Sequence, residues 1–146
     1  QPDRSLGLEM ANSSLTNEWH FSDPGAVPLS SWAHVAVSFN STTRDVAFFV
    51  DGVAAGTANY SIVPSSHGDT NPLFIGKQGF GCNCNFFDGR VDEVKIWNYE
   101  KSDFSDRLSR PQGDEPNLIA YYAMDENLGT KLVDRSAKVN NGYLSD

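Results

Sequence analysis

The sequence predicts an all-β fold, an antiparallel β-sandwich (jelly roll), and three observations support this prediction. Apolar residues alternate with polar ones in short runs, which is the pattern of strands that bury one face. These runs follow one another at roughly 8–12-residue spacing, with turn residues between them and little helical pattern. The chain of 146 residues is 39% hydrophobic, which is enough to enclose a core.

The two clearest strands are expected over 34–39 and 45–50, where every second residue is apolar. Residues 40–43 are polar and predict the turn that joins them. Asp51-Gly52 predicts a hairpin turn after the second strand, because such a turn needs positive φ angles, which glycine adopts freely. Weaker strand patterns follow over 73–75, 91–97 and 118–124.

Two segments interrupt the strand pattern. A short helix is expected near 101–108, where Ser102 or Asp103 would cap its first turn. Residues 113–117 are polar, contain Pro116 and are the expected linker. The predicted division is therefore a jelly-roll domain over 1–112, this linker, and a last segment over 118–146.

The charge of the chain excludes one class of partner. Lys and Arg number 11 against 19 Asp and Glu, which gives a formal net charge of −8. The basic residues are scattered singly, whereas a nucleic-acid-binding surface needs them clustered. We therefore expect no nucleic-acid partner. We also expect no membrane span, because no apolar run approaches the ~20 residues that a span requires.

Two features bear on the compartment. N-glycosylation triplets begin at Asn12, Asn40 and Asn59, although a Ser/Thr-rich chain also produces such triplets by chance. Cys82 and Cys84 form a C-x-C pair, for which we expect a local disulfide closed by a tight turn. Two free thiols or two metal ligands are the alternatives. Together these features favour an extracellular glycoprotein, secreted or at the cell surface.

One carboxylate is placed unusually in its strand pattern. Over 91–97, alternation puts Asp92 on the same face as Val94 and Ile96. If that face is buried, the carboxylate needs hydrogen-bond donors, a base or a cation, because a buried unpaired charge is costly. Capping of backbone N–H groups is one answer, and calcium, which takes oxygen ligands, is the other.

The loop 134–142 offers further oxygen ligands. It contains Asp134, the amides of Asn140 and Asn141, and the flexible Gly142. The loop is not an EF-hand, which needs D-x-[DN]-x-[DN]-G and a later Glu. As a lone pattern it is unspecific, since Asx-rich loops are more often plain turns than metal sites.

Several segments together carry a family pattern. They are S-W-A-H-V-A-V over 31–37, F-V-D-G over 49–52, L-F-I-G over 73–76, F-D-G-R-V-D-E-V-K-I-W-N over 87–98, L-I-A-Y-Y-A-M-D-E-N over 118–127 and the loop 134–142. They resemble the laminin-G-like, concanavalin A-like jelly rolls, which are related in shape to pentraxins. The F-x-G-x-[IV]-D-E-V-x-I-W segment is the most specific of them.

The resemblance implies a calcium site. In calcium-binding members of the family, the Asp of the I-D-E-V strand and the Asp of the D-x-S loop are ligands. The matching residues here are Asp92 and Asp134, and the shell would be completed by Asn140, Asn141 and Gly142. The resemblance therefore implies Ca²⁺ as the cofactor.

The order of the segments departs from the family. There the Y-Y-x-M-D-E strand and the D-x-S loop open a domain, and the W-x-H-V strand comes late. The chain is therefore expected either to span the end of one repeat and the start of the next, or to be permuted, with 118–144 closing the same sandwich. An incomplete sandwich would expose strand edges, so other protein domains or copies of itself are expected partners, by strand addition.

The sequence predicts a binding or structural role rather than catalysis. It lacks G-x-S-x-G, H-E-x-x-H, P-loop and G-x-G-x-x-G motifs, and the E-x-D-x-E run of jelly-roll glycosidases. We predict a non-catalytic, extracellular, calcium-binding structural or adhesion module of a larger protein. The alternative is a lectin-like module that binds glycans, and a third hypothesis is an accessory domain of a glycan-processing enzyme. Aromatic residues that could stack on sugars, but could also pack in the core, are Trp19, Trp97, Tyr60 and Tyr121.

The calcium hypothesis makes a thermal prediction. Calcium should raise the midpoint of thermal unfolding, because a ligand that binds only the folded state stabilises it, and Asp92→Ala should abolish the rise. A midpoint unchanged by EDTA would count against the hypothesis.

Overall fold

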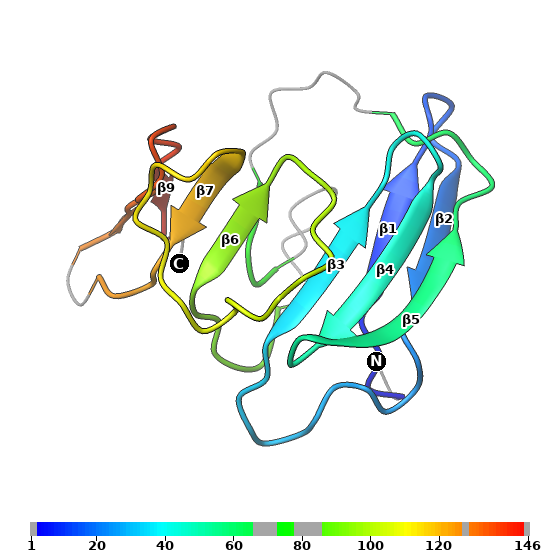
Figure 1. The fold of residues 1–146 in the computed structure, drawn as a ribbon, viewed down its shortest axis with the longest axis horizontal. Helices are drawn as coiled ribbons and strands as arrows, with labels where there is room; N and C mark the ends of the chain where they lie inside the picture. Colours follow the sequence, from blue (N-terminus) through cyan, green and yellow to red (C-terminus); the bar gives the residue numbers. More distant parts are fainter. Residues whose placement is uncertain (1–2, 66–72, 78–85, 127–128, 145–146) are drawn as a thin grey trace. The chain divides into compact units, whose positions relative to one another are not determined.

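The computed structural model describes residues 3–65, 73–77, 86–126 and 129–144, and within them the chain is all-β (Figure 1). Every paired strand in these residues is antiparallel, which confirms the predicted fold class. None of the described residues forms a helix of the length and apolar character that crossing a membrane requires. The chain forms two compact units, unit 1 (Gln1–Asp69 with Tyr99–Ser109) and unit 2 (Thr70–Asn98 with Arg110–Asp146).

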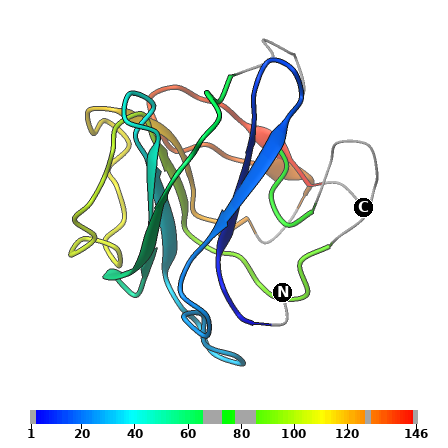
Figure 2. The ribbon, with the colours of Figure 1, turned by 90° about the vertical axis from the view of Figure 1, so that its right-hand side faces the viewer.

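Unit 1 is built from two sheets that face each other. One is a hairpin of β1 (Gly7–Ala11) and β2 (Asn17–Phe21), and the other has the order β3 (Val35–Phe39), β4 (Asp45–Val50) and β5 (Val53–Asn59). Figure 2 shows the hairpin and the three-stranded sheet as two layers. The short strands and polar turns of the sequence thus produce a small sandwich.

The core of unit 1 lies between these layers. Val46, Phe48 and Tyr60 are fully buried, and Leu8 and Met10 of β1 pack against them from the opposite sheet. The register of β3 on β4 aligns the apolar residues as alternation predicts, with Val35 opposite Val50, Val37 opposite Phe48 and Phe39 opposite Val46. Burial of this apolar surface is the main force that holds the layers together.

Two polar features fix the geometry of unit 1. The Asp51-Gly52 turn is present, with φ angles of 52° and 81°, and Asp51 Oδ1 accepts a hydrogen bond from the backbone N–H of His34 (2.9 Å). The Tyr60 hydroxyl donates to the carbonyl of Leu8 (2.6 Å), so its polar end is satisfied inside the core. Burial, with some contribution from the nearby Glu18 and Glu9, raises the pKa of Tyr60.

The helix expected near 101–108 is wrong, because residues 105–108 form turns and residues 101–104 have no regular structure. The backbone N–H of Arg107 donates to the carbonyl of Phe104, three residues back, and Asp103 Oδ1 takes the N–H of Ser105 (2.8 Å). Side-chain bonds of this kind compete with a helix, and a segment this short has little helical stability of its own. Phe104 is buried against Phe49, which anchors the turns to the sheet.

Unit 2 contains two small antiparallel pairs. They are β6 (Val94–Trp97) with β7 (Leu118–Tyr122), and β8 (Lys131–Leu132) with β9 (Gly142–Tyr143). A single bridge joins Tyr122 of β7 to Asp134. Part of the strand expected over 118–124 is present as β7, which pairs with β6. The strand expected over 73–75 is absent, since residues 73–77 form no strand.

The expected linker 113–117 is packed within unit 2. Gly113 is buried, its carbonyl accepts a hydrogen bond from the N–H of Ala137 (2.7 Å), and its own N–H donates to Glu115 (2.9 Å). The division of the parent chain into 1–112 and 118–146 stays a prediction.

Gly113→Ala should destabilise unit 2 strongly. Gly113 has a φ of 102°, and an added Cβ would collide with the carbonyl oxygen of Arg135. We expect a loss of at least ~2 kcal/mol in the free energy of unfolding, measured by chemical denaturation. Gly129→Ala is the matched control, because Gly129 has a φ of 93° but no atom within 4 Å of the added Cβ. Equal losses of unfolding free energy in the two variants would show that the close approach of Gly113 to the Arg135 carbonyl does not matter.

Candidate functional site

Asp92 does not face the core as alternation predicted. It is exposed, it lies before β6 rather than in it, and its Oδ1 accepts a hydrogen bond from the backbone N–H of Glu93 (3.0 Å). Glu93 has a φ of 55°, in the left-handed region. This conformation breaks the alternation that extends back from Val94, so the inward orientation expected for Asp92 is wrong.

The half-buried carboxylate in this segment is that of Glu93. The Tyr121 hydroxyl donates to its Oε2 (2.8 Å), and the Arg110 guanidinium lies 3.0 Å from its Oε1. Burial, and then the hydrogen bond to Glu93, raises the pKa of Tyr121 to about 12. Arg110 also pairs with Asp125 (2.7 Å), which lies 3.6 Å from Arg135, so two carboxylates face two guanidinium groups. Glu93 is not among the residues that the sequence predicts for the site, because D-E-V carries no signal of a left-handed residue.

Asp134 is buried, and hydrogen-bond donors surround its carboxylate. Its Oδ1 accepts from the backbone N–H groups of Tyr121 (2.8 Å) and Ser136 (2.9 Å). Its Oδ2 accepts from the Ser136 hydroxyl (2.9 Å) and the backbone N–H of Asn140 (2.7 Å). Burial alone would raise the pKa of Asp134, but these hydrogen bonds outweigh it and lower the pKa below its usual value.

The other expected calcium ligands are also engaged within the protein. Asn141 Oδ1 accepts the backbone N–H of Asp134 (3.1 Å), and the Asn140 carbonyl accepts the Tyr122 hydroxyl (2.6 Å). Gly142 begins β9. The loop thus closes on its own Asp134, in the manner of an Asx-type cap.

These residues do not fit the calcium site that the resemblance implied. Four donors occupy the lone-pair directions of Asp134, and Asp92 is exposed. Across 3–65, 73–77, 86–126 and 129–144, no group of three or more His, Cys, Asp or Glu residues could hold a metal ion. Calcium binding stays a prediction. Cys82 and Cys84, the expected disulfide pair, lie outside the described residues.

The three glycosylation acceptors lie in unit 1. Asn12 shapes a turn with its Oδ1, while the Nδ2 atoms of Asn40 and Asn59 donate to Glu100 (2.6 Å) and Asp45 (2.8 Å). A glycan attached at Nδ2 would disturb the last two bonds but not the turn at Asn12. Glycosylation stays a prediction.

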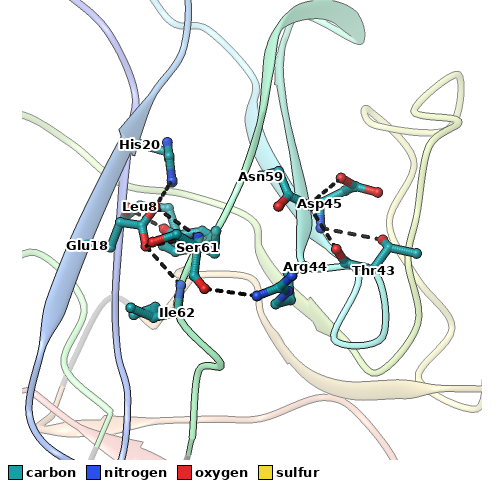
Figure 3. A network of polar contacts seen from close by, with 10 residues as sticks. Leu8, Glu18, His20, Thr43, Arg44, Asp45, Asn59, Ser61 and Ile62 are labelled. Carbon is teal, nitrogen blue, oxygen red and sulfur yellow. Dashed lines mark hydrogen bonds and ion pairs between the residues drawn. The ribbon is translucent and has the colours of Figure 1, made fainter.

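A polar network joins the sheets of unit 1, and Glu18 of β2 is its centre (Figure 3). Its carboxylate accepts from the backbone N–H of Ser61 (3.0 Å) and of Ile62 (3.1 Å), and from the Ser61 hydroxyl (2.7 Å). His20 lies 2.8 Å from the other carboxylate oxygen. The hydrogen bonds from Ser61 are the main cause that lowers the pKa of Glu18 to about 2.

This network is structural rather than catalytic. A serine nucleophile needs its hydroxyl bonded to a base that the third residue orients. Here the Ser61 hydroxyl and His20 both bond to Glu18. Arg44 donates to the Ser61 carbonyl (2.9 Å) from the other side, which holds the segment after β5 in place.

The four aromatic residues suggested for sugar stacking differ in exposure. Tyr60 and Tyr121 are buried, and Trp97 is half-buried against the core of unit 2. Trp19 is 52% exposed, on the side of β2 opposite to Glu18. Of these four, Trp19 is therefore the residue that can meet a ligand.

Trp19 belongs to an exposed set of side chains on the outer side of the β1–β2 hairpin. Its ring lies parallel to that of Phe21, at 9° between planes and 6.0 Å between centroids, and Phe21 is 42% exposed. Glu9 lies directly opposite Trp19 in the register, and the Asn17 amide donates to Glu9 Oε1 (2.7 Å). We call Glu9, Asn17, Trp19 and Phe21 the aromatic face.

The aromatic face combines apolar rings with hydrogen-bond acceptors. Two large rings on one strand form a continuous apolar surface, which water solvates poorly. The Asn17–Glu9 bond uses one carboxylate oxygen, so Glu9 Oε2 and Asn17 Oδ1 remain acceptors beside the rings. Such a surface suits a ligand with both C–H faces and hydroxyl donors.

The comparisons with known proteins agree with the fold. Residues 2–103 match the family model described as the concanavalin A-like lectin/glucanases superfamily, of laminin G type. A crystal structure from Bacteroides ovatus, described as a candidate carbohydrate-binding protein, superposes with a TM-score of 0.70 at 19% identity. The match covers 96% of this chain and 42% of that chain, so this chain spans less than half of it. A search of curated proteins finds no match.

Asp134→Asn should destabilise the protein whether or not calcium is present. The new amide would turn N–H groups toward donors that now bond the carboxylate, and these donors would be left unsatisfied. We expect a loss of about 3 kcal/mol in the free energy of unfolding, measured by urea denaturation in EDTA and in calcium. Asp92→Asn is the control and should cost under about 0.5 kcal/mol, since Asp92 is exposed. A loss for Asp134→Asn that appeared only in calcium would contradict the structural role.

Glu18→Gln should change the acid dependence of stability. The pKa of Glu18 falls from 4.5 to about 2 on folding, so the carboxylate stabilises the fold above pH 4.5. This contribution is lost as the pH falls toward 2. The difference in unfolding free energy between wild type and Glu18→Gln should therefore shrink as the pH falls below 4.5. Urea unfolding over pH 2–7 measures it, and a difference independent of pH would refute the account.

Proposed function

The chain belongs to the concanavalin A-like lectin/glucanases superfamily, and from this premise we propose that it is a lectin-like module that binds carbohydrate on its aromatic face. The observation that carries the proposal is the parallel, exposed pair of Trp19 and Phe21 beside the Glu9–Asn17 hydrogen bond. The description of the Bacteroides ovatus structure as a candidate carbohydrate-binding protein supports it.

The chemistry of a sugar matches that of the aromatic face. A pyranose ring has an apolar side lined with C–H groups, which packs on the flat face of Trp or Phe and removes both surfaces from water. Its hydroxyls at the rim donate hydrogen bonds, for which Glu9 Oε2 and Asn17 Oδ1 are suitable acceptors. Binding sites commonly combine an apolar platform with a few placed polar groups in this way.

The arrangement supports binding rather than glycosidic cleavage. Glycoside hydrolysis ordinarily uses two carboxyl groups on either side of the scissile bond. The aromatic face has one carboxylate, Glu9, and the carboxylate of Glu18 points to the other side of β2, into its bonds with Ser61 and Ile62. The module would then serve a larger, extracellular protein by attaching it to a glycan.

Trp19→Ala should abolish most of the glycan affinity. Removing the indole deletes the larger half of the apolar platform, and we expect affinity to fall at least ~10-fold, as when a central aromatic anchor is removed from an interface. Affinity electrophoresis in gels that contain a panel of neutral soluble polysaccharides measures the retardation.

Trp32→Ala is the matched control for this experiment. Trp32 is also exposed, at 65%, but it lies in the segment before β3 rather than on the aromatic face. Its loss should leave retardation unchanged. Wild-type retardation in Trp19→Ala, with the fold intact by circular dichroism, would exclude the aromatic face as the site.

A further inference from the structure

The aromatic face carries a negative charge and no positive one. Its ionisable member is Glu9, because the other members are an amide and two aromatic rings. The remaining outward positions of the two strands are Gly7 and Ala11, which bear no charge. No cation is therefore built into the face.

Two of the basic side chains of unit 1 are engaged elsewhere. The Arg44 guanidinium donates to the Ser61 carbonyl (2.9 Å), and Lys101 pairs with Asp106 (3.0 Å). His20 lies on the inner side of β2 with Glu18. The formal charge of the whole chain is −8, so the wider field opposes an approaching anion as well.

Anionic glycans need cationic side chains, which the aromatic face does not contain. Sulfate and uronate groups are bound by Arg and Lys, whose donors match their oxygens. On the aromatic face such a group would meet two acceptors, Glu9 Oε2 and Asn17 Oδ1, and the N–H donors of Asn17 and Trp19 carry no positive charge. The hydroxyls of an uncharged sugar can donate to the same two atoms at no electrostatic cost.

From these contacts we propose that Glu9 is a specificity-determining residue, which makes the aromatic face select uncharged glycan chains and reject sulfated or uronate-bearing ones. The inference rests on the proposed function, since it concerns the same face. Glu9 acts by repelling anions and by accepting a hydroxyl hydrogen bond, while Trp19 and Phe21 provide the platform. The hydrogen bond from Asn17 orients the carboxylate.

The test uses one polymer in two forms. The neutral polysaccharide that retards wild type most strongly is compared with the same polymer after partial sulfation, and the ratio of the two affinities is measured at several salt concentrations. Wild type should bind the neutral form at least ~5-fold more tightly at low salt, and the preference should weaken as added salt screens the charges.

Two variants on the face should move this ratio in opposite directions. Glu9→Gln removes the charge while keeping the shape, and should reduce the preference for the neutral form at least ~3-fold. Asn17→Asp replaces the amide that donates to Glu9 with a second carboxylate, so that two negative charges repel an anion, and it should strengthen the preference. Glu100→Gln is the control, because it makes the same change in net charge at an exposed residue outside the face, and it should leave the ratio unchanged.

The outcomes separate this inference from the proposed function. Tighter binding of the sulfated form by wild type, or equal effects of Glu9→Gln and Glu100→Gln, would overturn the role of Glu9 while carbohydrate binding stands. If wild type binds no neutral polysaccharide and Trp19→Ala changes nothing, the proposed function itself fails, and the selectivity with it.

Discussion

The hydrogen bonds of the Glu18 carboxylate fix the orientation of β2 in unit 1, and the aromatic face depends on that orientation. They join β2 to Ser61 and Ile62, which follow β5 in the opposite sheet. Because successive residues of a strand point to opposite sides, fixing Glu18 on the inner side fixes Trp19 on the outer side. His20, two residues on, packs its ring edge-to-face on the buried Tyr60 (4.5 Å) and strengthens the same orientation. The hydrogen bonds of Glu18 on the inner side of β2 therefore determine that the aromatic face lies on the outer side.

Much of the fold could be predicted, because its strongest signals are local. Alternation over 34–39 and 45–50 sets the register of β3 on β4, and Asp51-Gly52 has the positive φ angles that its turn requires. The predictions failed where one residue with a left-handed backbone conformation, or one tertiary contact, overrode the local sequence pattern. The left-handed Glu93 reversed the side that Asp92 faces, and the burial of Phe104 helped to replace the expected helix with turns.

The candidate site was less predictable, since it depends on burial and pairing between distant segments. The sequence offered Asp134 as a calcium ligand, and the partners that the structure shows for it are hydrogen-bond donors from β7 and its own loop. Four aromatic residues were equivalent in the sequence, and their exposure separates Trp19 from the others. Glu9 and Asn17 gave no signal, because their hydrogen bond arises from the pairing of two strands with weak alternation.

The most direct test of the account observes the ligand at the indole of Trp19. The chain has three tryptophans, so its ¹H–¹⁵N spectrum contains three indole N–H signals, which the variants Trp19→Ala and Trp32→Ala assign. On titration with the neutral polysaccharide's oligomer, the signal of Trp19 should shift in a saturable way, while those of Trp32 and Trp97 stay in place. Saturable shifts confined to Trp32 or Trp97, with Trp19 unmoved, would contradict the account.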